Sequence, residues 1–143
     1  MTSTATTATA KTAPAKILFT GRTHVSAGPN GAARSSDGAL DIKLPEPHPA
    51  AEQLFAAAWS ACYLGAIQLA AQQKKVRLPA LPEVDTQIEL GNGAGGFFLR
   101  ARLDVSVPGI DRAVAQDLIE MAHGTCPYSK AVHGNIDVTT TLV

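Results

Sequence analysis

Several stretches of the chain alternate between apolar and polar side chains, which is the pattern of β-strands that bury one face. Residues 83–90 and 97–107 alternate in this way, and the glycine-rich residues 91–96 between them have the backbone freedom that a hairpin loop needs. Residues 135–143 also alternate, which predicts a strand at the C-terminus. The expected buried faces consist of Val84, Thr86, Ile88 and Leu90 in the first strand and of Phe97, Leu99, Ala101, Leu103, Val105 and Val107 in the second.

Two further strands are expected near the N-terminus. Residues 16–26 and 33–44 are rich in strand-forming side chains, and the sequence Gly-Pro-Asn-Gly at 28–31 lies between them. Glycine, proline and asparagine each favour turn conformations, so we expect these two segments to pair around this turn.

Two segments have the spacing of helices. The shorter one, residues 111–123, repeats apolar side chains on one stripe and is followed by Gly124, a typical helix stop. The longer one begins after Pro49, carries Glu52 in its first turn and ends near residues 74–75, both lysines. Negative charge at the start and positive charge at the end of this helix match the helix dipole.

The longer helix contains an uncharged run, residues 54–71, which is long enough to span a membrane. Ser60, Gly65 and Gln68 interrupt the run, and a single span would leave the amphipathic strands without cover. We therefore interpret it as a helix enclosed by protein. One small sheet gives too little cover for such a helix, so we expect a subunit interface along it.

Length and composition favour one domain. The chain has 143 residues, with 12 basic and 12 acidic side chains, so net charge gives no case for binding nucleic acid or an anionic membrane. Residues 1–15 form a Ser/Thr/Ala tract that we interpret as a disordered tail, which leaves residues 16–143 as the domain. Two cysteines cannot form a disulfide scaffold, and the sequence does not resemble a secretory signal, so we expect a cytoplasmic protein.

The two cysteines are the candidate reactive groups. Cys62 lies in the apolar helix, where it is either a core side chain or a reactive thiol. Cys126 precedes Pro127, which suits the first position of a short helix, so Cys126 is expected at an N-cap, where the helix dipole favours a thiolate. Only His123 and His133 lie near Cys126 in the sequence, which is too few ligands to indicate a metal site, and a Cys-His hydrolase would lack its glycine elbow.

Two thiols of this kind are also consistent with a redox pair, in which one attacks a peroxide and the other closes a disulfide. Such a nucleophile needs a cation to hold it ionised and a carboxylate to orient the cation. Glu52 is the candidate carboxylate, although it could equally complement the helix dipole. One continuous helix would separate Glu52 from Cys62 by about 15 Å, so we expect Glu52 of one subunit to serve Cys62 of another.

These residues resemble those of a known family. Residues 51–66 and 126–138 are similar to the two signature segments of the organic hydroperoxide resistance (Ohr) proteins, within the wider OsmC family. Residues 35–44 and 107–112 also match, so the resemblance covers nearly all of the chain after the tail. It implies an α+β fold with antiparallel sheets around a long central helix, and an intertwined homodimer. It further implies reduction of alkyl and fatty-acid hydroperoxides to alcohols with no metal or cofactor, and recharging by a dithiol reductant such as a lipoylated protein.

The resemblance also assigns roles to individual residues. Cys62 would be the thiol that attacks the peroxide, Cys126 the resolving thiol that forms a disulfide with it, and Glu52 the carboxylate that orients an arginine. Apolar side chains around Cys62 would favour alkyl peroxides over hydrogen peroxide. These side chains are Phe55, Trp59, Tyr63 and Leu64.

The chain departs from the family pattern at the catalytic arginine. The family's arginine follows Gly-Gly in the first hairpin turn, and the aligned position here is Pro29. Arg34 and Arg22 are the candidate substitutes. The family's Asn-Pro-Glu-Gln is also altered, to Ala-Ala-Glu-Gln at 50–53. Two alternatives therefore stay open: a peroxide-sensing or apolar-ligand-binding protein with little turnover, and a structural domain with inert thiols.

Overall fold

The computed structural model describes residues 15–143, which fall into two compact units divided after Pro49. The predicted disordered tail, 1–15, lies outside the described residues except for its last one. The interpretation of residues 16–143 as one domain stays a prediction.

The first unit is a three-stranded antiparallel sheet. Its strands are β1 (Thr23–Ser26), β2 (Ala32–Ser35) and β3 (Asp41–Lys43), in that order across the sheet. The expected turn between β1 and β2 is present, with Gly28 at φ 98° and a 2.9 Å hydrogen bond from the Gly31 N–H to the Gly28 carbonyl.

The predicted strand 33–44 is wrong in one respect, because a second turn divides it into β2 and β3. The Asp37 carboxylate accepts hydrogen bonds from the Ser35 hydroxyl at 2.6 Å and the Ala39 N–H at 3.0 Å, and Gly38 has a φ of 76°. The sequence Ser-Asp-Gly is a turn signal that outweighs the strand pattern on either side. The predicted strand 16–26 is likewise shorter, because β2 gives β1 partners only from Thr23 onward.

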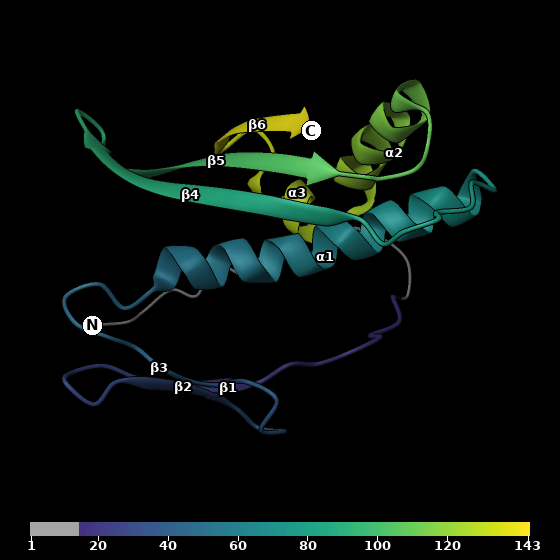
Figure 1. Cartoon of the computed structure of the whole chain (residues 1–143). Coiled ribbons are helices and arrows are strands. Elements are labelled where there is room, and N and C mark those ends of the chain that lie inside the picture. Colours follow the sequence, from purple (N-terminus) through teal and green to yellow (C-terminus); the bar gives the residue numbers. More distant parts are fainter. Residues whose placement is uncertain (1–14) are drawn as a thin grey trace. The chain divides into compact units, whose positions relative to one another are not determined.

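The second unit is a sheet covered by helices. The long helix α1 (Ala51–Gln73) precedes the hairpin of β4 (Glu83–Gly93) and β5 (Gly96–Ser106). The helices α2 (Arg112–Thr125) and α3 (Pro127–Val132) then lead to β6 (Asp137–Leu142). β4 and β5 are antiparallel, whereas β6 pairs parallel to β5, since the helical crossover returns the chain to the same end of the sheet. Figure 1 shows α1 running along one face of this sheet.

The hairpin loop is shorter than predicted. Residues 91–93 continue β4, and Gly93 pairs with Gly96, so only Ala94 and Gly95 form the turn. Gly91 pairs with Phe98 of β5, and the ring of Phe98 occupies the space where a Cβ at position 91 would lie, so a glycine suits this strand position. Phe97 was expected on the buried face but is 78% exposed, because it lies next to the tip of the hairpin, which extends past the start of α1 in Figure 1.

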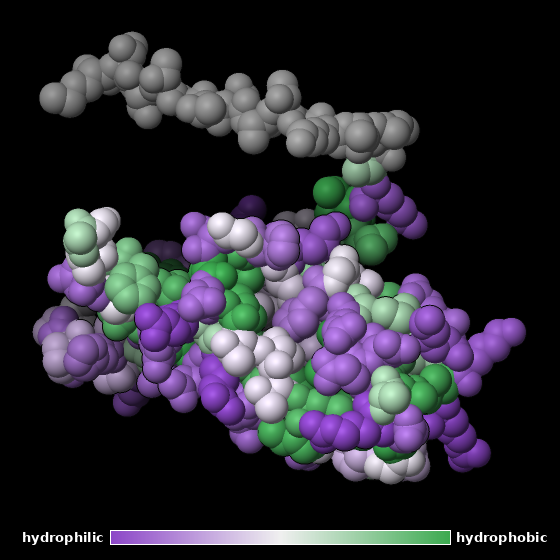
Figure 2. Space-filling view, turned by 90° about the horizontal axis from the view of Figure 1, so that it is seen from above, coloured by the Kyte–Doolittle hydropathy of each residue, from purple (hydrophilic) through white to green (hydrophobic). Residues whose placement is uncertain are grey.

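The core forms between α1, the inner face of the sheet and the two shorter helices. The strand pattern is confirmed at its centre, where Leu103 and Val105 are fully buried. The outer face carries charged and amide side chains, and Figure 2, viewed from above Figure 1, shows hydrophilic side chains over much of the visible surface. From α1, the buried side chains are Trp59, Tyr63, Ala66, Ile67, Ala70 and Ala71.

α1 is long and apolar enough to cross a membrane by length and composition alone, but core helices meet the same criteria. One face of α1 is packed in the core, as expected of a helix covered by protein. The opposite face is exposed in the single chain and consists mainly of small side chains. Cover of this face by a second subunit stays a prediction. Its exposed residues are Ala57, Ala58, Ala61, Gly65, Gln68 and Leu69.

The predicted stop of the second helix at Gly124 is wrong. Asp111 caps the start of α2, accepting hydrogen bonds from the N–H groups of Ala113 at 3.1 Å and Val114 at 3.4 Å, but the helix runs through Gly124 to Thr125. Cys126 ends α2 with an extended ψ of 118°. Because Pro127 forces the residue before it out of the helical region, the proline rather than the glycine ends α2.

Candidate active site

The two cysteines lie in contact, although 64 positions separate them in the chain. Cys62 is half-buried on α1, and Cys126 is fully buried at the junction of α2 and α3. Their Sγ atoms are 3.3 Å apart, with the Cys126 thiol donating to the Cys62 sulfur, and both thiols are free. A disulfide bond is about 2.05 Å long, so the sulfurs need to approach by little more than 1 Å to be joined.

Cys126 is the N-cap of α3, as predicted. Its Sγ accepts a hydrogen bond from the Ser129 N–H at 3.5 Å, and Pro127 occupies the first helical turn. The residue therefore ends one helix and begins the next, which places its sulfur at a fixed point against α1.

The surroundings of Cys62 within this chain favour the neutral thiol. Burial raises the pKa of Cys62, and the contact with Cys126 raises it further, while a hydrogen bond from the backbone of Tyr128 lowers it. Burial dominates because it removes water from the thiolate. Ionisation of Cys62 therefore calls for an additional positive charge.

Glu52 does not reach Cys62 in the same subunit. Both belong to α1, which is unbroken from Ala51 to Gln73, so about 15 Å of helix separates them. Glu52 is half-buried in the first turn. The roles assigned to it and to the cysteines stay predictions.

The two candidate arginines belong to the first unit. Arg34 lies on β2, where its Nε is 3.1 Å from the Asp41 Oδ1, and both side chains are exposed. Arg22 is exposed just before β1. An exposed ion pair contributes little stability, so Arg34 could exchange Asp41 for another partner at small cost.

The four apolar side chains expected around Cys62 fall into two groups. Trp59 and Tyr63 are buried in the core, whereas Phe55 and Leu64 are half-buried beside it. The Phe55 and Trp59 rings meet edge to face, with centroids 5.9 Å apart. Their role as a substrate pocket stays a prediction.

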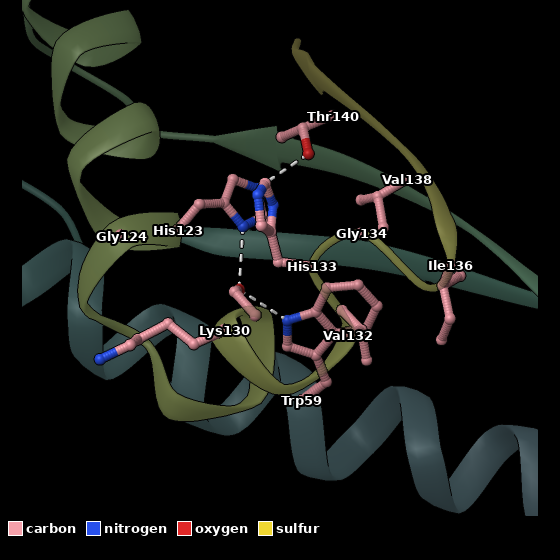
Figure 3. A pocket seen from close by; sticks show the side chains of 11 residues that line it. Trp59, His123, Gly124, Lys130, Val132, His133, Gly134, Ile136, Val138 and Thr140 are labelled. Atoms are coloured by element: carbon pink, nitrogen blue, oxygen red, sulfur yellow. Dashed lines mark hydrogen bonds between the residues drawn. The ribbon is translucent and has the colours of Figure 1, made fainter. Parts of the chain in front are cut away.

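A chain of hydrogen bonds beside the cysteines was not predicted from the sequence. Trp59 Nε1 donates to the Ser129 Oγ at 2.9 Å, the same oxygen lies 2.9 Å from His123 Nδ1, and His123 Nε2 lies 2.8 Å from the Thr140 Oγ1 (dashed lines in Figure 3). The His123 ring stacks on Tyr63 with centroids 4.3 Å apart. Burial lowers the pKa of His123 and raises that of Tyr63.

A cleft of about 650 Å³ lies against this chain of hydrogen bonds, all of whose members line it. Trp59, Val132, Ile136 and Val138 supply its apolar lining, and Lys130 adds a positive charge (Figure 3). Neither cysteine lines it. Within residues 15–143, no three His, Cys, Asp or Glu side chains are grouped to hold a metal ion.

Comparisons with known proteins show the family of this chain. A family model described as OsmC-like protein matches residues 44–141, more than half of the chain. The organic hydroperoxide resistance protein of Xanthomonas axonopodis pv. citri is 43% identical over 138 residues, which cover 90% of this chain and 97% of that protein.

Solved structures extend the agreement to the fold. The organic hydroperoxide resistance protein OhrB of Bacillus subtilis has a TM-score of 0.79 at 36% identity, covering 89% of this chain and 100% of that one. The organic hydroperoxide resistance protein of Elizabethkingia anophelis has a TM-score of 0.81 at 35% identity, covering 90% and 98%. The predicted α+β, OsmC-like fold is thus confirmed, and the chain belongs to the OsmC family, with the organic hydroperoxide resistance proteins as its relatives.

Proposed function

We propose that the protein is a thiol-dependent peroxidase that reduces organic hydroperoxides to alcohols, and so contributes to peroxide resistance. The observation that carries the proposal is the 3.3 Å contact between a half-buried thiol, Cys62, and a second thiol at a helix N-cap, Cys126. The names of the relatives support the choice of substrate class.

The first chemical step is attack of the Cys62 thiolate on the terminal oxygen of the hydroperoxide. An S–O bond forms, the O–O bond breaks, and the alkoxide leaves as the alcohol after it takes up a proton. The sulfur is oxidised to a sulfenic acid while the peroxide is reduced. Phe55 and Leu64, which are partly buried against the same core as Cys62, would favour substrates with an alkyl group, as the family resemblance implies.

The second step is resolution by Cys126. Its sulfur attacks the sulfenic sulfur, the S–S bond forms, the S–O bond breaks, and the oxygen leaves as water. One hydroperoxide and two thiols thus give one alcohol, one water and one disulfide. A dithiol such as a lipoyl group returns both cysteines to the thiol form by exchange.

Activation of Cys62 depends on a second subunit in this proposal. The 15 Å of α1 between Glu52 and Cys62 prevents them from meeting in one chain, and the exposed face of small side chains on α1 suits close packing of two such helices in a homodimer. Glu52 of one subunit then orients Arg34 or Arg22 toward Cys62 of the other, which would offset the effect of burial on its pKa. The reaction takes place in the cytoplasm, where dithiol reductants are available.

Two measurements test the proposal. Steady-state turnover with cumene hydroperoxide and dihydrolipoamide is expected, and Cys62→Ser should abolish it. After one equivalent of cumene hydroperoxide, the intact mass of the wild type should fall by two hydrogen atoms, whereas that of Cys126→Ser should rise by oxygen. A wild type that keeps both thiols under these conditions would refute the proposal.

A second candidate function is peroxide sensing with little turnover. Two observations favour it: Pro29 stands at the position of the family's arginine, and burial raises the pKa of Cys62 in the single chain. A sensor would form the disulfide once but would not be recharged rapidly by dihydrolipoamide. Single-turnover oxidation without steady-state turnover would therefore favour this function over a peroxidase.

A further inference from the structure

The hydrogen bond between Trp59 and Ser129 lies beside the sulfur contact and joins the same two helices. Trp59 is three residues before Cys62 on α1, and Ser129 is three residues after Cys126 in α3. Three residues are close to one helical turn, so the hydrogen bond and the sulfur contact form two neighbouring points of attachment between α1 and α3. Two points restrain the rotation of α3 on α1 as well as the distance between them.

The direction of one hydrogen bond follows from the groups alone, because an indole Nε1 can only donate, so the Ser129 oxygen accepts from Trp59. Burial favours the neutral His123 ring, which donates from one nitrogen and accepts at the other. We assign its proton to Nε2, so that the Ser129 hydroxyl donates to Nδ1 and the Nε2–H donates to the Thr140 Oγ1. We call Trp59, Ser129, His123 and Thr140 the relay; its members come from α1, α3, α2 and β6.

The relay connects directly to the resolving thiol. The Ser129 side chain receives the hydrogen bond from Trp59, and the Ser129 backbone N–H donates to the Cys126 Sγ at 3.5 Å. Trp59 is 1% exposed and Ser129 is 6% exposed, so water does not replace the hydrogen bond easily if it is lost. Movement of Ser129 would shift the start of α3 and with it the sulfur of Cys126.

We propose that the relay positions Cys126 for disulfide closure and so protects Cys62 from over-oxidation. This inference rests on the proposed peroxidase function. The sulfenic acid on Cys62 has two fates: Cys126 attacks it and water leaves, or a second hydroperoxide oxidises it to a sulfinic acid and a second alcohol leaves. The relay accelerates only the first fate, because only that fate depends on where the Cys126 sulfur lies.

The partition between these fates is the readout. Wild type and variants are treated with increasing cumene hydroperoxide, and intact mass gives the ratio of disulfide to sulfinic acid. This ratio depends on events after the sulfenic acid has formed, so it does not depend on the rate of the first attack. Loss of general stability alone does not change it either, provided that circular dichroism shows each variant to be folded.

Three variants and a matched control test the relay. Ser129→Ala removes the central oxygen and should lower the ratio about tenfold, the effect of losing a buried hydrogen bond between the two helices. Trp59→Phe keeps an aromatic ring but removes the indole donor together with some buried volume, and it should lower the ratio in the same direction. Ser129→Thr keeps a hydroxyl and should keep the ratio of the wild type. Ser60→Ala is the control, because Ser60 lies on the same helix but its hydroxyl bonds the Thr86 Oγ1 of β4, at 2.7 Å, rather than a member of the relay.

The outcomes separate the two proposals. A lower ratio in Ser129→Ala and Trp59→Phe, with Ser129→Thr and Ser60→Ala like the wild type, supports the relay. An unchanged ratio in folded Trp59→Phe overturns it, even if Ser129→Ala fails to fold. Absence of any disulfide in the wild type would instead refute the peroxidase function itself.

Discussion

Closure of the disulfide between Cys62 and Cys126 should stabilise the fold strongly. The bond would join residues 64 positions apart. A cross-link over a loop of this length removes enough entropy from the unfolded chain to raise the free energy of unfolding by about 4 kcal/mol. Because the sulfurs already lie 3.3 Å apart, closure should cause little strain to offset this gain. For a chain of this size, a gain of this order corresponds to a rise in Tm of about 10 °C or more.

Urea unfolding at one protein concentration measures the difference. The unfolding is monitored by circular dichroism. Wild type reduced with a phosphine is compared with wild type oxidised by one equivalent of cumene hydroperoxide. Cys126→Ser treated in the same way is the control, since it can be oxidised but cannot form the intramolecular bond. Equal midpoints for the reduced and oxidised wild type would refute the reasoning. An equal shift in the control would refute it too, because the shift would then come from oxidation and not from the cross-link.

Four further predictions follow from the geometry. A mixture of Glu52→Ala and Cys62→Ser subunits should recover activity through heterodimers, and turnover no higher than that of the separate variants would contradict a shared site. Gly65→Trp should leave the fold of the single chain intact, because a Cβ at this position meets nothing within 4 Å. The variant should nevertheless elute as a monomer in size-exclusion chromatography, and a dimer that persists would place the interface elsewhere. Leu103→Ala, at a fully buried position, should lower the free energy of unfolding by about 2–5 kcal/mol in urea titrations. Burial lowers the pKa of His123, so this side chain takes up a proton at a higher pH in the unfolded chain than in the folded one. The free energy of unfolding should therefore fall as the pH drops below about 6.5. His123→Gln should show a shallower fall between pH 7.5 and 5, and a slope identical to that of the wild type would contradict this assignment.

The elements that could be predicted from the sequence are those with long, regular patterns. The alternation in residues 83–90 and the uncharged run of α1 each extend over several turns or pleats, so single exceptions do not obscure them. The wrong predictions concern turns and helix ends, where a single residue determines the local structure. Asp37 closes a turn inside a predicted strand, and Pro127 rather than Gly124 ends α2.

Features of the site that depend on neighbouring residues could be predicted, whereas those that depend on distant residues could not. The N-cap position of Cys126 follows from its neighbour Pro127 and is local, so it could be predicted. The contact of Cys126 with Cys62 depends on how two distant helices pack, so the residues alone left it as one of several alternatives, and the family resemblance selected it. The role of Ser129 could not be predicted, because its partner Trp59 is 70 positions away and an isolated serine in a helix carries no sequence signal.

The junction at Cys126 has a consequence for how this region can vary. Cys126 serves both as the C-cap of α2 and as the N-cap of α3, so its sulfur has no linker on either side. An insertion or deletion of a single residue here would rotate α3 by roughly 100° and turn Ser129 away from Trp59. Length changes among relatives should therefore concentrate in the two-residue tip of the β4–β5 hairpin and leave the span from Cys126 to Ser129 constant.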